Sequence, residues 1–379
     1  MKFPIISADS HITEPNEAFD TVDARFRDRA PRVERIEGKG SFYVLDGFDN
    51  KFPAFMSSAA GRTPEQMRAD SEVYWESMHR SGWDPAFRLA DQARDGIAAE
   101  VIYPTIGMVM CGHENFDLKR AVFEGYNRWI GEYCSFSPTR LLGAGQTAMV
   151  SPDEGVRDLE QMKALGLRTA MLPAFPKLED YDSPIYDEFW AAAVALDMPI
   201  SFHVLTGGKS LFTADRGPRI NSFLGIIRSN QDIIGTLIYG GVFERNPKLS
   251  VICVEGDAGW VPHYMHRMDH AFNRHRNWMA PGVELSKAPS EYFRENIYLT
   301  FQDDITAFRN ADQMNWRRLM WANDFPHSDS TWPWSQDMLS EHTSNLTEEQ
   351  KHAILCGNVA NLYKIDVTEL HAEVLKQAA

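Results

Sequence analysis

The sequence has few cysteines, no long apolar run and no block of positive charge. Its four cysteines in 379 residues include no CxxC pair, which predicts reduced, mostly buried thiols in a cytoplasmic protein. No segment approaches the roughly 18 apolar residues that span a bilayer, and we expect no signal peptide at the start of the chain. Lys and Arg number 38 against 53 Asp and Glu, a net charge of −15, so neither nucleic acid nor a membrane is expected as a partner.

The composition and the order of apolar segments predict an α/β barrel. Apolar residues make up 44% of the chain and charged residues 24%, which is typical of a soluble globular protein. The length fits two or three ordinary domains or one barrel. Eight short, almost continuously apolar segments alternate with amphipathic stretches, as expected for parallel strands buried on both faces. These segments are residues 3–8, 98–104, 141–150, 168–173, 199–204, 249–254, 296–301 and 318–322. Eight strands alternating with helices predict a single (β/α)8 TIM barrel.

The remaining length falls into two long excursions and a tail. We expect residues 1–379 to form one domain, with residues 15–84 inserted after the first strand as a lid or subdomain. Residues 206–230 form a second excursion after the fifth strand, and residues 347–379 form one or two closing helices. The best-defined helices are predicted over residues 117–135, 151–165 and 184–196. Ser151 would cap the second of these and Gly166 would end it.

Polar residues stand at the ends of three predicted strands. Asp9 and His11 follow the first strand at i and i+2, so both side chains can face the barrel mouth. His203 lies at the end of the fifth strand and Asp324 follows the eighth. Each of these residues alone could be structural: a loop-closing hydrogen bond, a buried core histidine or a helix cap. Together they reach the rim where barrel enzymes hold their active sites, which favours a metal site.

The ligand types limit the choice of metal ion but do not select one. Two imidazole nitrogens and two carboxylates suit Zn²⁺, Mn²⁺ or Fe²⁺. Fewer than four tight protein bonds would leave a coordination position for water or substrate, as catalytic sites require.

Several longer motifs carry a resemblance to a known family. They are residues 9–15 (DSHITEP), 95–104 (DGIAAEVIYP), 126–129 (YNRW), 138–141 (PTRL), 255–262 (EGDAGWVP) and 323–327 (NDFPH). With these motifs the chain resembles the amidohydrolase-superfamily branch that contains aminocarboxymuconate-semialdehyde decarboxylase and related aromatic-acid decarboxylases. The resemblance implies a TIM barrel with one divalent metal, usually zinc or manganese, held by Asp9, His11, His203 and Asp324. It also implies a homodimer or higher homo-oligomer.

The chain departs from the family pattern at two positions. Family decarboxylases commonly have His or Glu where this chain has Asp9. After the sixth strand they carry a histidine with proton-transfer duty, and Glu255 stands at that position here. We therefore expect Glu255 to take the role, with His263, His266 or a metal-bound water as alternatives. A salt bridge from Glu255 to Arg267 is the structural alternative. The expected catalytic residues are Asp324, Glu255 and His203.

The substrate pocket is expected to come from the excursions and the last strand. An aromatic and methionine cluster in the first excursion could close over an aromatic substrate, or could pack a subdomain or a dimer contact. Candidate substrate-binding residues are Phe52 from this cluster, Trp332 and His327 after the eighth strand, and Arg62, with Arg68 as its alternative, for a substrate carboxylate.

Three functions remain open from the sequence. The first is a metal-dependent decarboxylase of a small aromatic or unsaturated carboxylic acid. The second is a metal-dependent hydrolase of a C–C, C–N or ester bond, which would use the same ligands and a metal-activated water. The third is a binding barrel without catalysis. The ligand-competent residues at one rim argue against this third function.

Overall fold

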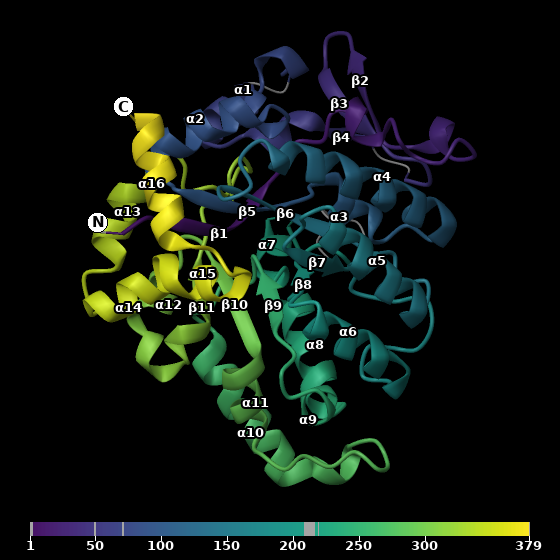
Figure 1. Cartoon of the computed structure of the whole chain (residues 1–379), viewed down its shortest axis with the longest axis vertical. Helices are drawn as coiled ribbons and strands as arrows, with labels where there is room; N and C mark the ends of the chain where they lie inside the picture. Colours follow the sequence, from purple (N-terminus) through teal and green to yellow (C-terminus); the bar gives the residue numbers. More distant parts are fainter. Residues whose placement is uncertain (1–2, 49–50, 70–71, 208–216, 219, 379) are drawn as a thin grey trace.

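The computed structural model describes residues 3–48, 51–69, 72–207, 217–218 and 220–378, and it confirms the predicted barrel (Figure 1). Eight parallel strands pair in chain order. They are β1 (Ile6–His11), β5 (Ala99–Tyr103), β6 (Leu141–Gln146), β7 (Thr169–Leu172), β8 (Ile200–His203), β9 (Val251–Val254), β10 (Ile297–Phe301) and β11 (Leu319–Trp321). Every residue of these strands is buried, because helices cover the outside and side chains fill the interior. All eight predicted segments are therefore strands, with ends that differ by a few residues.

The covering helices begin and end where the sequence predicts. Helix α4 spans Phe116–Ser135, α5 spans Pro152–Ala164, and α6 spans Asp187–Ala195 after a 3-10 turn at Pro184–Tyr186. The Ser151 hydroxyl accepts the N–H of Glu154 and so caps α5. The chain leaves α5 through Gly166, whose φ of +78° favours glycine.

The first excursion contains structure that the sequence analysis did not predict. Strands β2 (Arg32–Ile36), β3 (Gly40–Val44) and β4 (Phe52–Pro53) form a small antiparallel sheet, drawn in purple and blue at the upper right of Figure 1. The short helix α1 (Pro64–Ala69) follows, and α2 (Pro85–Asp95) leads into β5. Whether this segment acts as a lid remains a prediction.

The remaining helices complete the outer layer. They are α3 (Ile106–Met110), α7 (Asn221–Gly225), α8 (Arg228–Tyr239), α9 (Val242–Arg245), α10 (Val261–His275), α11 (Pro289–Asn296), α12 (Ile305–Arg309) and α13 (Ser335–His342). The tail forms α14 (Glu348–His352), a π-helical turn at Ala353–Gly357, α15 (Asn358–Tyr363) and α16 (Val367–Ala378). The turn and α15 contact β1 and β11, so the tail covers the place where the first and last strands meet.

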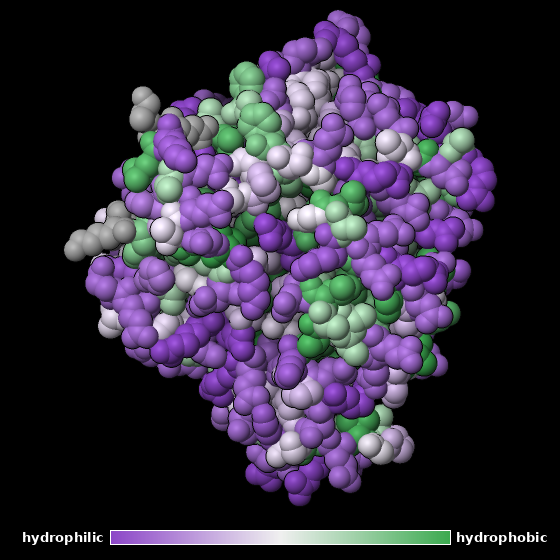
Figure 2. Space-filling model, in the orientation of Figure 1, coloured by the Kyte–Doolittle hydropathy of each residue, from purple (hydrophilic) through white to green (hydrophobic). Residues whose placement is uncertain are grey.

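The surface and the cysteines agree with the composition. The face drawn in Figure 2 is mainly hydrophilic, with hydrophobic side chains in separate groups. Cys111, Cys134, Cys253 and Cys356 are all buried and free, as predicted. Among the described helices, none is long and apolar enough to cross a membrane.

Candidate metal centre

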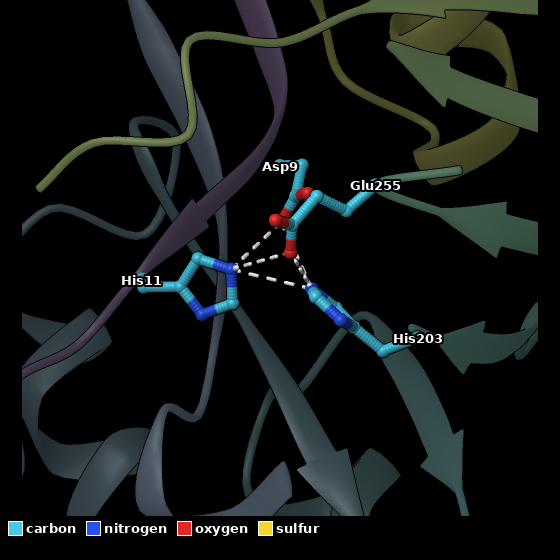
Figure 3. Close-up of side chains that lie close together, drawn as sticks. All are labelled: Asp9, His11, His203 and Glu255. Atoms are coloured by element: carbon cyan, nitrogen blue, oxygen red, sulfur yellow. Dashed lines mark hydrogen bonds and ion pairs between the residues drawn. The ribbon is translucent and has the colours of Figure 1, made fainter. Parts of the chain in front are cut away.

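Acidic and histidine side chains from β1, β8 and the segment after β9 converge at one end of the barrel (Figure 3), and Asp324, after β11, adjoins them. Within β1, His11 Nε2 lies 3.5 Å from Asp9 Oδ1, and it lies 3.3 Å from Asp324 Oδ1. His203 Nε2 lies 3.2 Å from His11 Nε2 and 3.5 Å from Glu255 Oε2. Three of the four predicted ligands, Asp9, His11 and His203, therefore form one group with Glu255, and Asp324 belongs to a second group with His11, Glu255 and His327.

The hydrogen bonds of the two histidines fix which nitrogen faces the cluster. His11 Nδ1 lies 3.1 Å from the Pro104 carbonyl oxygen, and His203 Nδ1 lies 3.0 Å from that of Val204. A carbonyl oxygen only accepts, so each Nδ1 carries a hydrogen and the two Nε2 atoms face each other at 3.2 Å. Two Nε2 lone pairs at this distance repel each other unless a cation or a proton lies between them. Such an Nδ1–H to carbonyl bond is the usual support of a metal-binding histidine.

The carboxylate oxygens of the cluster also lack hydrogen-bond donors around them. Both oxygens of Asp9, and Oε2 of Glu255, are buried without a hydrogen-bond partner in the described part of the chain. Burial raises the pKa of the Asp9 carboxyl well above its usual value, and the same cause raises the pKa of Asp324 and of Glu255. Burial lowers the pKa of His11. A divalent cation would supply the positive partner that these buried carboxyl groups lack and would favour their ionised form, so the cluster fits a metal-binding site.

The backbone turns sharply where two of these carboxylates leave their strands. Glu255 follows β9 with a φ of +57°, and Asp324 follows β11 with a φ of +51°. This left-handed conformation is uncommon for residues other than glycine and is held at a cost of about 1–3 kcal/mol where a site requires it. At both positions it accompanies a side chain that reaches back into the barrel mouth.

His327 also joins the cluster. Its ring stacks on that of His11 with 3.9 Å between centroids, and its Nδ1 lies 3.3 Å from Asp324 Oδ1. Its Nε2 lies 2.9 Å from the Thr105 hydroxyl. The side chain is 14% exposed, so it stands at the edge of the cluster, where a substrate would approach. Its substrate-binding role remains a prediction.

The substrate-binding roles of the other three predicted residues also remain predictions, and the contacts described for them are with residues outside the cluster. The indole of Trp332 packs against Phe325 and His79, and its N–H donates to a carbonyl of α2. Arg62 lies near His79, whose pKa is lowered mainly by burial and also by the charge of Arg62. Phe52 lies in β4, where its ring contacts that of Phe48. These contacts do not place the three side chains at the cluster, and the side chain of Arg68 lies outside the described part of the chain.

The alternatives to Glu255 are not brought to the site. His263 and His266 lie on α10 and are exposed. One residue was missed: Tyr103 ends β5, and its ring lies 5.4 Å from that of His203 and 6.4 Å from that of His11. A search for aromatic as well as polar residues at the ends of the predicted strands would have found Tyr103.

A buried glutamate next to the site should make stability depend on pH. Glu14 Oε1 accepts the N–H groups of Thr105 (2.9 Å), Ile106 (2.9 Å) and Gly107 (3.3 Å) at the start of α3. Burial raises the pKa of Glu14 from 4.5 to about 7. Between these values the folded protein binds more protons than the unfolded chain, so this group makes the protein less stable as the pH rises toward 7.

Replacing Glu14 with Gln should remove this pH dependence, because the amide resembles the protonated acid. We expect the variant to exceed the unmodified protein by up to ~3 kcal/mol in unfolding free energy at pH 8, with little difference at pH 5. Urea unfolding of metal-free protein at both pH values measures this. The exposed Glu17, replaced with Gln, is the control and should show no such trend. Equal differences at both pH values would contradict the prediction.

The fold and the cluster define a class, the metal-binding (β/α)8 barrels with a mixed histidine and carboxylate centre. A family model described as amidohydrolase matches residues 11–365, and the chain belongs to this family.

Individual relatives are distant. The chain is 22% identical over 313 residues to 2-amino-3-carboxymuconate-6-semialdehyde decarboxylase of Dictyostelium discoideum, covering 79% of this chain and 82% of the relative. Among solved structures, an amidohydrolase from Mycobacterium avium subsp. paratuberculosis superposes with a TM-score of 0.73 at 19% identity, over 96% of this chain and all of the other. A 5-carboxyvanillate decarboxylase from Novosphingobium aromaticivorans, complexed with manganese and a nitrobenzoic acid, has a TM-score of 0.67 at 18% identity, over 96% of each chain. At these identities the structural matches establish the fold.

Proposed function

We propose that this protein is a metal-dependent decarboxylase of a small aromatic or unsaturated carboxylic acid. The observation that carries the proposal is the buried cluster of Asp9, His11, His203, Glu255 and Asp324 at the C-terminal end of the barrel. The decarboxylases among the family relatives favour this reaction over others on the same scaffold.

Asp9, His11, His203 and Asp324 would hold one divalent cation. Manganese is supported by the Novosphingobium structure, and zinc and iron suit the same donors. When bound, such an ion supplies Lewis-acid polarisation of a substrate oxygen. A homo-oligomeric assembly and a cytoplasmic location belong to the same proposal.

The chain's own residues would bind the substrate and move one proton. Glu255 Oε2 is buried among the ligands, yet the side chain is 13% exposed, so it faces the side from which a substrate enters. Decarboxylation exchanges a carboxylate for a proton on the same carbon. Glu255, with Asp324 as the alternative, would donate that proton to the carbon as its bond to the carboxylate carbon breaks, and would recover it from water. His327 at the edge of the cluster would contact the substrate, while its two ring nitrogens remain paired with Asp324 and the Thr105 hydroxyl.

A hydrolase is the second candidate, and Glu255 itself favours it. Glu255 replaces the histidine that the resemblance assigns to proton transfer in decarboxylases. A carboxylate beside a metal centre can instead accept a proton from an attacking water.

Isotope labelling separates the two reactions. The manganese-loaded protein is incubated with 5-carboxyvanillate, related hydroxybenzoic acids and their amides or esters, in D₂O and in H₂¹⁸O. A decarboxylase releases CO₂ and leaves one deuterium on the carbon that lost it, with no ¹⁸O in the other product. A hydrolase places one ¹⁸O in the product and releases no CO₂. A protein that binds no divalent metal under these conditions would contradict both.

A further inference from the structure

The metal centre lies across the seam at which the barrel closes. Paired strands run from β1 to β11, and among the described residues no strand ladder joins β11 back to β1. The two ends are joined instead by separate bonds. The N–H of His11 donates to the Phe325 carbonyl at 2.7 Å, and the N–H of Asp324 donates to the Asp9 carbonyl at 3.2 Å. Three of the four proposed ligands therefore belong to two segments that few backbone bonds hold together.

Arg88 of α2 spans this seam from outside the barrel. Its Nη1 donates to the carbonyl of His11 at 2.7 Å, and its Nη2 donates to the carbonyl of Phe325 at 3.2 Å. Its Nε donates to Glu100 Oε2 of β5 at 2.5 Å. The arginine side chain is fully buried. One planar guanidinium thus holds the main chain of a ligand from β1 and the main chain next to a ligand after β11.

Glu100 extends the contact to the other side of Asp324. Its Oε1 accepts Asn323 Nδ2 at 3.3 Å, and its Oε2 also accepts Gln92 Nε2 at 3.0 Å. The backbone N–H of Asn323 donates in turn to Ser7 Oγ of β1 at 2.9 Å. The ion pair therefore touches the residue before Asp324 and the residue after it.

We propose that Arg88 and Glu100 form a buried clasp that sets the distance between the metal ligands of β1 and Asp324 after β11, which makes Arg88 a positioning residue for the metal centre. The proposal rests on the metal-dependent function above. A lysine could not replace Arg88. The planar guanidinium reaches its three acceptors with three separate nitrogens at once, and a single ammonium group cannot. Supports of this kind typically change metal affinity by about 10- to 100-fold when they are removed.

Arg140 offers a matched control in the same network. It is also buried, and it donates to the Ala98 carbonyl at 2.8 Å and to Gln92 Oε1 at 3.0 Å. Those acceptors lie before β5 and on α2, away from the seam. Replacing either arginine with lysine disturbs the buried network, but only Arg88→Lys loosens the carbonyls beside the ligands.

The experiment measures Mn²⁺ binding to metal-free full-length protein by electron paramagnetic resonance, alongside thermal unfolding without metal. We expect Arg88→Lys to weaken Mn²⁺ binding by about 10- to 100-fold and Arg140→Lys by less than about 3-fold, at similar losses of unfolding temperature. If Arg88→Lys does not fold, Glu100→Gln takes its place, with weakening by several-fold expected. Affinity unchanged in the clasp variant, or weakened equally in Arg140→Lys, would overturn the proposal. Wild-type protein that binds Mn²⁺ without releasing CO₂ would overturn the proposed reaction and leave the clasp standing.

Discussion

Replacing His203 with alanine is expected to abolish metal-dependent turnover. We expect kcat/KM for decarboxylation to fall by at least ~10³-fold, since the loss of a metal ligand removes several kcal/mol of charge stabilisation. His203 has its Nδ1 fixed by the Val204 carbonyl and its Nε2 directed at three other cluster residues, so no neighbouring side chain can substitute for it. Metal content by mass spectrometry and CO₂ release measure the two effects together.

The control for this variant is His266→Ala. His266 is exposed on α10, so its loss should leave metal content and turnover within about 2-fold. If His203→Ala keeps both its metal and its activity, the cluster is not the active site.

Replacing Glu255 with glutamine is expected to lower kcat by about 10²- to 10⁴-fold, the usual contribution of a general acid or base. The amide keeps the size of the side chain, but it cannot give up and recover a proton. Because Glu255 Oε2 lies 3.5 Å from His203 Nε2, this carboxylate could also serve as a ligand. Retained metal with lost turnover supports proton transfer, whereas lost metal assigns Glu255 to the ligand set.

Asp257→Asn is the matched control for Glu255. Asp257 stands two residues further on, has a similar φ of +52° and is exposed. We expect this variant to keep most of its activity. A Glu255→Gln variant that turns over as fast as Asp257→Asn would rule out the catalytic role and favour water or Asp324 as the proton donor.

The barrel could be predicted from the sequence because its signals are local. An apolar run such as residues 249–254, followed by Glu255, Gly256 and Asp257, identifies a buried strand and its end without knowledge of its neighbours. The same locality explains why Asp9, His11, His203 and Asp324 were found, since each stands at a strand end. Only the structure shows that their atoms converge, because strand ends far apart in sequence meet through the closure of the barrel.

What the sequence did not reveal depends on long-range packing. The small sheet β2–β3–β4 was missed because its strands are short and lie in a segment without clear alternation. The contact of Trp332 with α2 also gave no signal in the sequence, and its substrate-binding role remains a prediction. Arg88 gave no signal, because a charged residue on an amphipathic helix is usually solvated, and its burial follows only from the docking of α2 against the seam.

The seam between β1 and β11 also has a consequence for how the protein is made. The ribosome releases the segment with Asp9 and His11 long before the segment with Asp324, so the complete ligand set cannot exist on a nascent chain that lacks its last barrel strand. Until then nothing from the β11 side covers β1, so we expect the side chains of Asp9 and His11, which are buried in the finished barrel, to be exposed to water. Metal uptake is therefore expected to follow barrel closure in newly made protein.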